Sequence, residues 1–113
     1  MKLAVVGSRG LREIALAPHI PAGTEEIISG GAVGVDACAA AYARENGLRL
    51  TEILPQYERY GRAAPIIRNR AIVEQADAVL VFWDGRSKGT QSVIAYAKKL
   101  GKPITVIPCG TGI

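Results

Sequence analysis

The sequence predicts an α/β domain with a three-layer αβα architecture, in which helices cover both faces of an open parallel sheet of about five strands. Short β-branched runs alternate with longer alanine-rich stretches, which is the pattern of βαβ units. The short runs are apolar throughout, as in strands buried on both faces, and glycine-bearing turns follow them. The 113 residues, 49% of them hydrophobic and 21% charged, suit a single domain over residues 1–113.

The amino-terminal half is expected to supply three strands and one helix. Residues 3–6 and 27–28 are aliphatic runs that each lead into a glycine-bearing turn. Residues 35–46 carry apolar side chains at helical spacing and end at an Asn-Gly pair. A third strand is expected around residues 48–54, where Pro55 stops it.

The carboxyl-terminal half continues the alternation. It is expected to contain a polar, irregular loop over 56–64, a helix over 66–75, a strand over 78–83, a turn over 84–90, a helix over 91–100 and a last strand over 104–107. The loop over 56–64 is the longest of the connections, so we expect it to cover a site.

Composition excludes several classes of function. The apolar runs are far shorter than the ~20 residues of a membrane helix, and no signal-like stretch precedes Gly7, so a cytoplasmic protein is expected. Cys38 and Cys109 lack the spacing of a zinc site or redox pair. His19 is the only histidine and lies in a proline-bounded loop, which argues against a catalytic triad. We expect no metal and no cofactor, and the net charge of +4 mildly favours anionic ligands.

Ligands of an open parallel sheet bind beyond the carboxyl ends of its strands, and two glycine-bearing turns lie at such ends. In the turn over 7–10, Gly7 allows a close backbone approach and Arg9 offers phosphate a bidentate fork, although an ordinary turn with a solvated arginine fits equally well. The glycines of 29–34 would present backbone N–H groups to an anion where a helix begins. Asp36 either stabilises the first helical turn or accepts a ligand hydroxyl.

Two polar clusters follow in the second half of the chain. Arg68 and Arg70 are two positions apart on a helix, so only one of them, Arg68 together with Asn69, is expected to line a site; the alternative is a solvated basic face. In the turn over 84–90, Asp84 is placed to accept hydrogen bonds from ribose hydroxyls, and hydroxyl and N–H groups follow it. An Asp-Gly turn with a Ser or Thr helix cap would explain the same residues without a ligand.

Together these turns resemble motifs of the SLOG superfamily, a Rossmann-like group that unites the Smf/DprA DNA-processing proteins with the LOG nucleotide phosphoribohydrolases. Residues 29–36, SGGAVGVD, are similar to the Smf/DprA stretch SGGAxGID, and residues 68–70 match its RNR. Residues 82–90, FWDGRSKGT, resemble the FWDGxSxGT of a short stand-alone branch. The resemblance covers essentially the whole chain, in the same order.

The resemblance implies a nucleotide or nucleotide-derived ligand over the ends of the first, second and fourth strands. The ligand-binding candidates are Gly7, Ser8, Arg9, Ser29, Gly30, Gly31, Ala32, Gly34, Asp36, Arg68, Asn69, Asp84, Ser87, Gly89 and Thr90. LOG enzymes carry PGGxGTxxE with a catalytic glutamate, whereas this chain has Val93 at that position and Trp83-Asp84-Gly85 in place of PGG. LOG-type hydrolysis is therefore not expected, and no catalytic residue is assigned.

The leading hypothesis is a module that senses a nucleotide-derived small molecule. The glycine turns would hold phosphate, Asp84 or Asp36 the ribose hydroxyls, and Arg9 or Arg68 would neutralise charge. One alternative is single-stranded DNA binding along the arginines of 59–70, although most aromatic side chains are expected in the core. Another is N-glycosidic hydrolysis with Asp84 or Asp36 as acid or base. We expect no membrane partner, and a homo-oligomer as among the relatives.

Overall fold

The computed structural model describes residues 1–8, 10–11 and 14–109. Its elements, in chain order, are β1 (Lys2–Gly7), η1 (Ala17–His19), β2 (Glu26–Ser29), α1 (Val35–Glu45), β3 (Arg49–Glu52), α2 (Tyr57–Tyr60), η2 (Gly61–Ala63), α3 (Ala64–Gln75), β4 (Ala78–Trp83), α4 (Lys88–Lys99) and β5 (Ile104–Pro108). The five strands form one sheet in the order β3-β2-β1-β4-β5, and every pair is parallel. The predicted α/β fold with an open five-stranded parallel sheet is confirmed.

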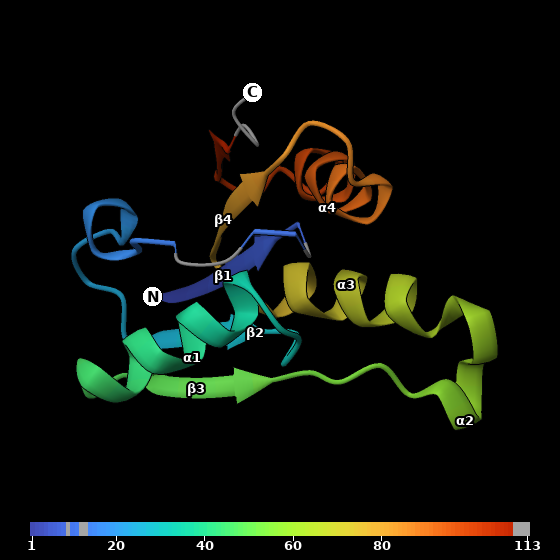
Figure 1. The fold of residues 1–113 in the computed structure, drawn as a ribbon, viewed down its shortest axis with the longest axis horizontal. Helices are drawn as coiled ribbons and strands as arrows, with labels where there is room; N and C mark the ends of the chain where they lie inside the picture. Colours follow the sequence, from blue (N-terminus) through green and yellow to red (C-terminus); the bar gives the residue numbers. More distant parts are fainter. Residues whose placement is uncertain (9, 12–13, 110–113) are drawn as a thin grey trace.

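The alternation of side chains along the two central strands builds a core on each face of the sheet. Leu3 and Val5 of β1 pack with Leu80 and Phe82 of β4 and with α1, whereas Ala4 lies in the opposite core. That second core contains buried side chains from both α3 and α4. The helices therefore form the outer layers of an αβα sandwich, with α1 on one side and α3 and α4 on the other (Figure 1).

The order of the strands places a crevice at the ends of β1 and β4. The chain moves from β1 outward to β2 and β3, then crosses to β4 and β5 on the other side of β1. The connection from the end of β1 consequently leads to the face of the sheet that α1 covers, whereas the connection from the end of β4 leads to α4 on the opposite face. Such a switch in winding direction is where open α/β sheets bind ligands.

Three details differ from the sequence-based expectations. The segment 56–64 is not irregular, because α2, η2 and the first residue of α3 occupy it. Helix α3 begins before Ile66 because Pro65 fits the first turn of a helix, where its missing N–H costs no hydrogen bond. Helix α4 begins at Lys88, three residues earlier than expected, because the side chain of Ser87 caps it.

Most aromatic side chains lie in the core or pack against it, as predicted: Tyr42, Phe82, Trp83 and Tyr96 do so, and two tyrosines do not. Phe82 is buried, and its ring meets the edge of His19 at 5.6 Å between ring centres. Tyr57 and Tyr60 are 55% and 36% exposed, and Trp83 is half-buried. The two exposed tyrosines lie on α2, where a four-residue helix with no buried residue offers them nothing to pack against.

No helix in the described part of the chain is both long enough and apolar enough to span a bilayer.

Candidate functional site

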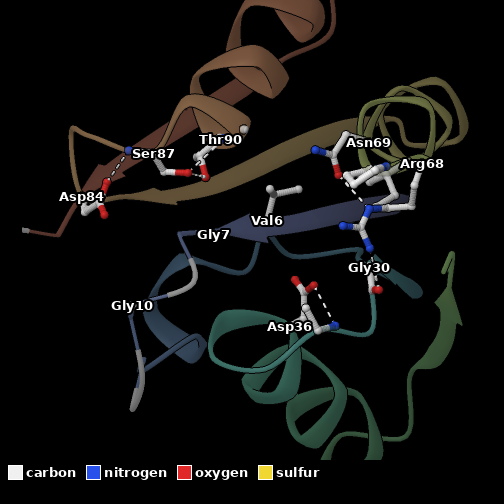
Figure 2. Close-up of a pocket in the computed structure, with 14 residues that line it drawn as sticks. Val6, Gly7, Gly10, Gly30, Asp36, Arg68, Asn69, Asp84, Ser87 and Thr90 are labelled. Carbon is white, nitrogen blue, oxygen red and sulfur yellow. Dashed lines mark hydrogen bonds between the residues drawn. The ribbon is translucent and has the colours of Figure 1, made fainter. Parts of the chain in front are cut away.

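A cavity of about 400 Å³ lies at the carboxyl ends of the central strands (Figure 2). Its floor includes the end of β1 at Val6 and Gly7, and its walls come from the starts of α1, α3 and α4. The predicted candidates that line it are Gly7, Gly30, Ala32, Asp36, Arg68, Asn69, Asp84, Ser87, Gly89 and Thr90. Four motifs that are far apart in the sequence thus surround one space.

Four other candidates support this cavity without lining it. Ser8 is buried, and its hydroxyl accepts a hydrogen bond from the Asp84 backbone N–H at 3.2 Å, which ties the turn after β1 to the turn after β4. Ser29 is also buried and accepts from the Gly31 N–H at 3.3 Å. Gly34 has φ +79° at the N-cap of α1, a conformation that suits glycine. Arg9, the remaining candidate, lies outside the described residues.

The absence of a side chain at two glycines allows close packing beneath the cavity. A Cβ on Gly7 would lie 2.3 Å from a methyl of Val35, so this glycine lets α1 pack against the end of β1. A Cβ on Gly30 would lie 2.6 Å from the Arg68 guanidinium and 2.9 Å from the Asp36 carboxylate. Gly30 therefore makes room for the two charged groups of the site to converge over the backbone.

Arg68 is held in a fixed orientation. Its Nη1 donates to the Gly30 carbonyl at 2.8 Å, and its Nε donates to Asn69 Oδ1 at 2.8 Å. Arg70 points elsewhere, because its guanidinium lies 5.4 Å from the ring centre of Tyr96 on α4. Of the two arginines, only Arg68, together with Asn69, lines the cavity, as helix geometry leads one to expect for side chains two positions apart.

Asp36 is a half-buried carboxylate in the first turn of α1. Its Oδ2 accepts a hydrogen bond from the Ala32 N–H at 3.1 Å, which closes the turn after β2. Burial raises the pKa of Asp36, and this effect outweighs the Ala32 hydrogen bond and the nearby Arg68 charge, which both lower it. The carboxylate lies in the first turn of α1, where one sequence interpretation placed it, but its hydrogen bond closes the loop before the helix. It also lines the cavity, where a ligand hydroxyl could reach it.

Asp84 organises the turn that leads into α4. Its Oδ1 accepts hydrogen bonds from the N–H groups of Arg86 at 2.8 Å and Ser87 at 2.9 Å. These two hydrogen bonds, the Ser87 one first, lower the pKa of Asp84 and keep it ionised. The Asp-Gly turn with a serine cap, which we weighed against a ligand role, is therefore present. The carboxylate nevertheless lines the cavity.

The start of α4 has the properties of an anion site. Ser87 Oγ accepts from the Thr90 N–H at 3.3 Å, and its backbone carbonyl is held by the indole N–H of Trp83 at 3.1 Å. No acidic residue occurs in the first turn, so no side chain of that turn offsets the positive end of the helix dipole. Gly89 lines the cavity, and a Cβ placed on it would meet nothing within 4 Å.

Sequence reasoning missed four lining residues: Val6, Gly10, Pro65 and Ile72. Gly10 belongs to the turn over 7–10, and Val6 directly precedes that turn. Their position at the end of the first strand could therefore have predicted that they line the site. Pro65 and Ile72 carried no polar signal, and only the packing of α3 beside β1 brings them to the cavity. Val93, which the resemblance aligns with the LOG glutamate, lies on the buried side of α4 and is 2% exposed.

Among residues 1–8, 10–11 and 14–109, no group of three or more His, Cys, Asp or Glu side chains gathers in a way that could hold a metal ion. The charged groups that do converge are one guanidinium and two carboxylates at separate places around the cavity, as Figure 2 shows. This donor set suits hydroxyl and phosphate groups of an organic ligand.

Comparison with known proteins gives one informative result. No family model matches the chain, and no solved structure matches it. The chain is 36% identical over 84 residues to "Gene 61 protein" of Mycobacterium phage D29, a match that covers 69% of this chain and 67% of the phage protein. With that identity and coverage, the chain belongs to the same family as Gene 61 protein of Mycobacterium phage D29.

Proposed function

We propose that the protein binds a nucleotide or a nucleotide-derived small molecule at the carboxyl edge of its sheet. The observation that carries this proposal is the convergence, around one cavity of about 400 Å³, of a fixed guanidinium, a half-buried carboxylate and a helix N-terminus. A cavity of that volume suits a small organic ligand. Each of the three groups recognises a different part of a phosphorylated sugar.

The phosphate end of the ligand would lie at the start of α4. The N–H groups of Lys88 and Gly89 belong to the first turn and Gly89 lines the cavity, whereas the Thr90 N–H already donates to Ser87 Oγ. The hydroxyls of Ser87 and Thr90 lie 3.1 Å apart beside them. Lys88 adds a positive charge to the same turn. The start of α1 suits phosphate less well, because the Asp36 carboxylate lies within its first turn. Asp84 precedes α4 instead, and its Oδ1 is held by the Arg86 and Ser87 N–H groups outside that helix. This shifts the phosphate role from the turn after β2 to the turn after β4.

The ribose end would lie across the cavity, where Figure 2 shows Asp36 and Arg68 near each other. A carboxylate accepts hydrogen bonds from sugar hydroxyls, and an arginine held by two hydrogen bonds loses little entropy on binding. The likeness of the three quoted motifs to the SLOG superfamily supports the same class of ligand.

The test compares two neighbouring arginines of α3. Thermal shift and calorimetric titration would use AMP, GMP, ADP-ribose, NAD, cyclic dinucleotides and ribose 5-phosphate, at low and high salt. We expect one of these ligands to stabilise the wild-type protein in a salt-tolerant manner. A ligand at about 100 times its Kd adds about 2.7 kcal/mol to the free energy of unfolding.

Arg68→Ala should weaken this binding by at least about tenfold, the cost of a lost charged hydrogen bond, while Arg70→Ala should leave it unchanged because Arg70 faces Tyr96. Equal effects of the two substitutions, or no binding by any ligand of the panel, would contradict the proposal. Release of free base during the titration would instead identify N-glycosidic hydrolysis.

Single-stranded DNA binding is a second candidate, favoured by one observation. Tyr57 and Tyr60 are exposed on α2 with Arg59 between them, whose guanidinium lies 5.2 Å from the centre of the Tyr60 ring. Aromatic rings interleaved with arginines are the usual surface for unstacked bases. This candidate requires affinity for an oligonucleotide that falls steeply with salt. Loss of that affinity in Tyr57→Ala, with no small-nucleotide binding in the wild type, would favour it.

A further inference from the structure

We infer that a second, smaller cavity beside the first receives the nucleobase of the ligand, so that the two cavities together bind one mononucleotide. This inference rests on the proposed function. The second cavity has a volume of about 190 Å³ and lies between the end of β3, α2 and α3. The segment 56–64, which the sequence predicts to cover a site, contributes four of its lining residues: Gln56, Arg59, Tyr60 and Ala64.

The two cavities adjoin at Arg68, which lines both. Their walls also meet along the chain, because Pro65 lines the first and Ala64 lines the second. The hydrogen bonds of Arg68 to the Gly30 carbonyl and to Asn69 hold its guanidinium at this boundary. A ligand with its sugar against Arg68 in the first cavity therefore has its next group directed to the second.

The lining of the second cavity is mainly apolar. Ile53 and Leu54 contribute one wall, and Ala71 and Ile67 of α3 contribute another. Leu54 is 60% exposed and Ile67 is 37% exposed, so two bulky aliphatic side chains of the second cavity face water. A flat apolar group that covers them would remove this surface from water, which is favourable.

The remaining lining residues suit the face and the edge of a base. Tyr60 lies beneath the Arg59 guanidinium at 5.2 Å, and both line the cavity, so an aromatic ring and a flat cation already form part of its wall. Gln56 adds an amide that both donates and accepts hydrogen bonds, as the polar edge of a base requires.

The experiment separates the base from the rest of the ligand. Calorimetric titration would compare ribose 5-phosphate, which fills only the first cavity, with AMP, GMP, CMP and UMP. We expect at least one mononucleotide to bind about tenfold or more tightly than ribose 5-phosphate, since stacking on a side chain commonly contributes that much.

The variant Ala71→Leu fills the second cavity from α3 without adding to the first. It should reduce the affinity for the mononucleotide to that for ribose 5-phosphate and leave the affinity for ribose 5-phosphate unchanged. Ala95→Leu, an identical change at an exposed position of α4, is the matched control and should alter neither affinity. Tyr60 is exposed and lies on a helix without buried residues. Tyr60→Leu should therefore weaken the binding of the mononucleotide about tenfold and leave the affinity for ribose 5-phosphate unchanged.

The outcomes distinguish the two proposals. If ribose 5-phosphate binds but no mononucleotide binds more tightly, or if Ala71→Leu and Tyr60→Leu both leave the difference intact, the base site is refuted and the proposed function stands. If neither kind of ligand binds the folded wild-type protein, both are refuted. A loss of both affinities in Ala71→Leu, with Tyr60→Leu equal to wild type, would also overturn the base site.

Discussion

At the scale of single residues, the site is a set of polar side chains whose orientation, and for the carboxylates whose pKa, is set by hydrogen bonds and burial within the protein. Arg68 donates to Gly30 and Asn69, and Asp84 accepts from two backbone N–H groups. Each of these groups is oriented before a ligand arrives, so binding would cost little side-chain entropy. Asp36 differs, because its burial disfavours the ionised form that the site requires.

This conflict predicts a pH-dependent effect of Asp36→Asn. A carboxyl with a raised folded-state pKa destabilises the fold when it is ionised; the cost is present above the folded pKa and absent below the ordinary value of 3.8. The amide removes that cost and can still accept the Ala32 hydrogen bond. We expect the variant to melt at a higher temperature than wild type at pH 7, with a difference that shrinks toward pH 4. A difference that is constant across this range would show that the charge does not matter.

A second prediction concerns Gly7 and Val35. A Cβ on Gly7 would lie 2.3 to 2.8 Å from three atoms of the Val35 side chain, closer than packed atoms approach. Gly7→Ala should therefore lower the free energy of unfolding by about 1–3 kcal/mol, as overpacked cores do. In the double variant with Val35→Ala, part of that loss should be regained. Strict additivity in urea denaturation of the two single variants and the double variant would contradict the steric explanation.

At the scale of elements, α1 and α4 present the site through their first turns, and the start of α4 combines a structural role with a proposed ligand role. Ser87 caps the helix through the Thr90 N–H. Helix α1 contributes Asp36 from its first turn, and α3 contributes the Arg68–Asn69 pair from its second turn. Small shifts of a helix start would therefore change the site more than the core.

Two substitutions of Ser87 separate its roles. Ser87→Ala should cost about 1 kcal/mol of stability because the cap is lost, as at other N-caps. Ser87→Asp should retain the stability, because aspartate is a good N-cap and favours the positive end of the helix. The same aspartate should weaken phosphate-bearing ligands by about tenfold or more through repulsion. Thermal melts and titrations of both variants would check this, and unimpaired binding to Ser87→Asp would place the phosphate elsewhere.

At the scale of the whole molecule, β1 and β4 belong to both cores, since alternate residues of each strand face opposite helix layers. The two layers should consequently unfold together. Leu80→Ala on the α1 side should lower the stability by about 2–5 kcal/mol, as buried leucines do. Trp83, which packs on the opposite face, then reports whether the effect is shared. Tryptophan fluorescence and far-UV circular dichroism should give one coincident transition; separate midpoints would mean that the faces unfold independently.

The fold and the edge of the sheet that carries the site were predictable because they depend on local patterns. Fully apolar runs followed by glycine turns indicate buried parallel strands, and parallel strands end at a common edge. That Arg68 and Arg70 point apart was also predictable, because residues two apart on a helix do not share a face. The exposed tyrosines of α2 were not, since a short polar segment gives no periodic signal of what it packs against.

The sequence by itself determined the α/β class, the alternation of elements, the positions of the glycine-bearing turns and the divergence of Arg68 and Arg70, all of which follow from spacing along the chain. Tertiary structure decided which polar groups meet. The Asp36 carboxylate comes close to Arg68 over Gly30, and the second cavity forms where α2 folds back beside α3. The physical reason is that spacing fixes the direction of a side chain relative to its own element, whereas burial and charge partners depend on the element packed against it.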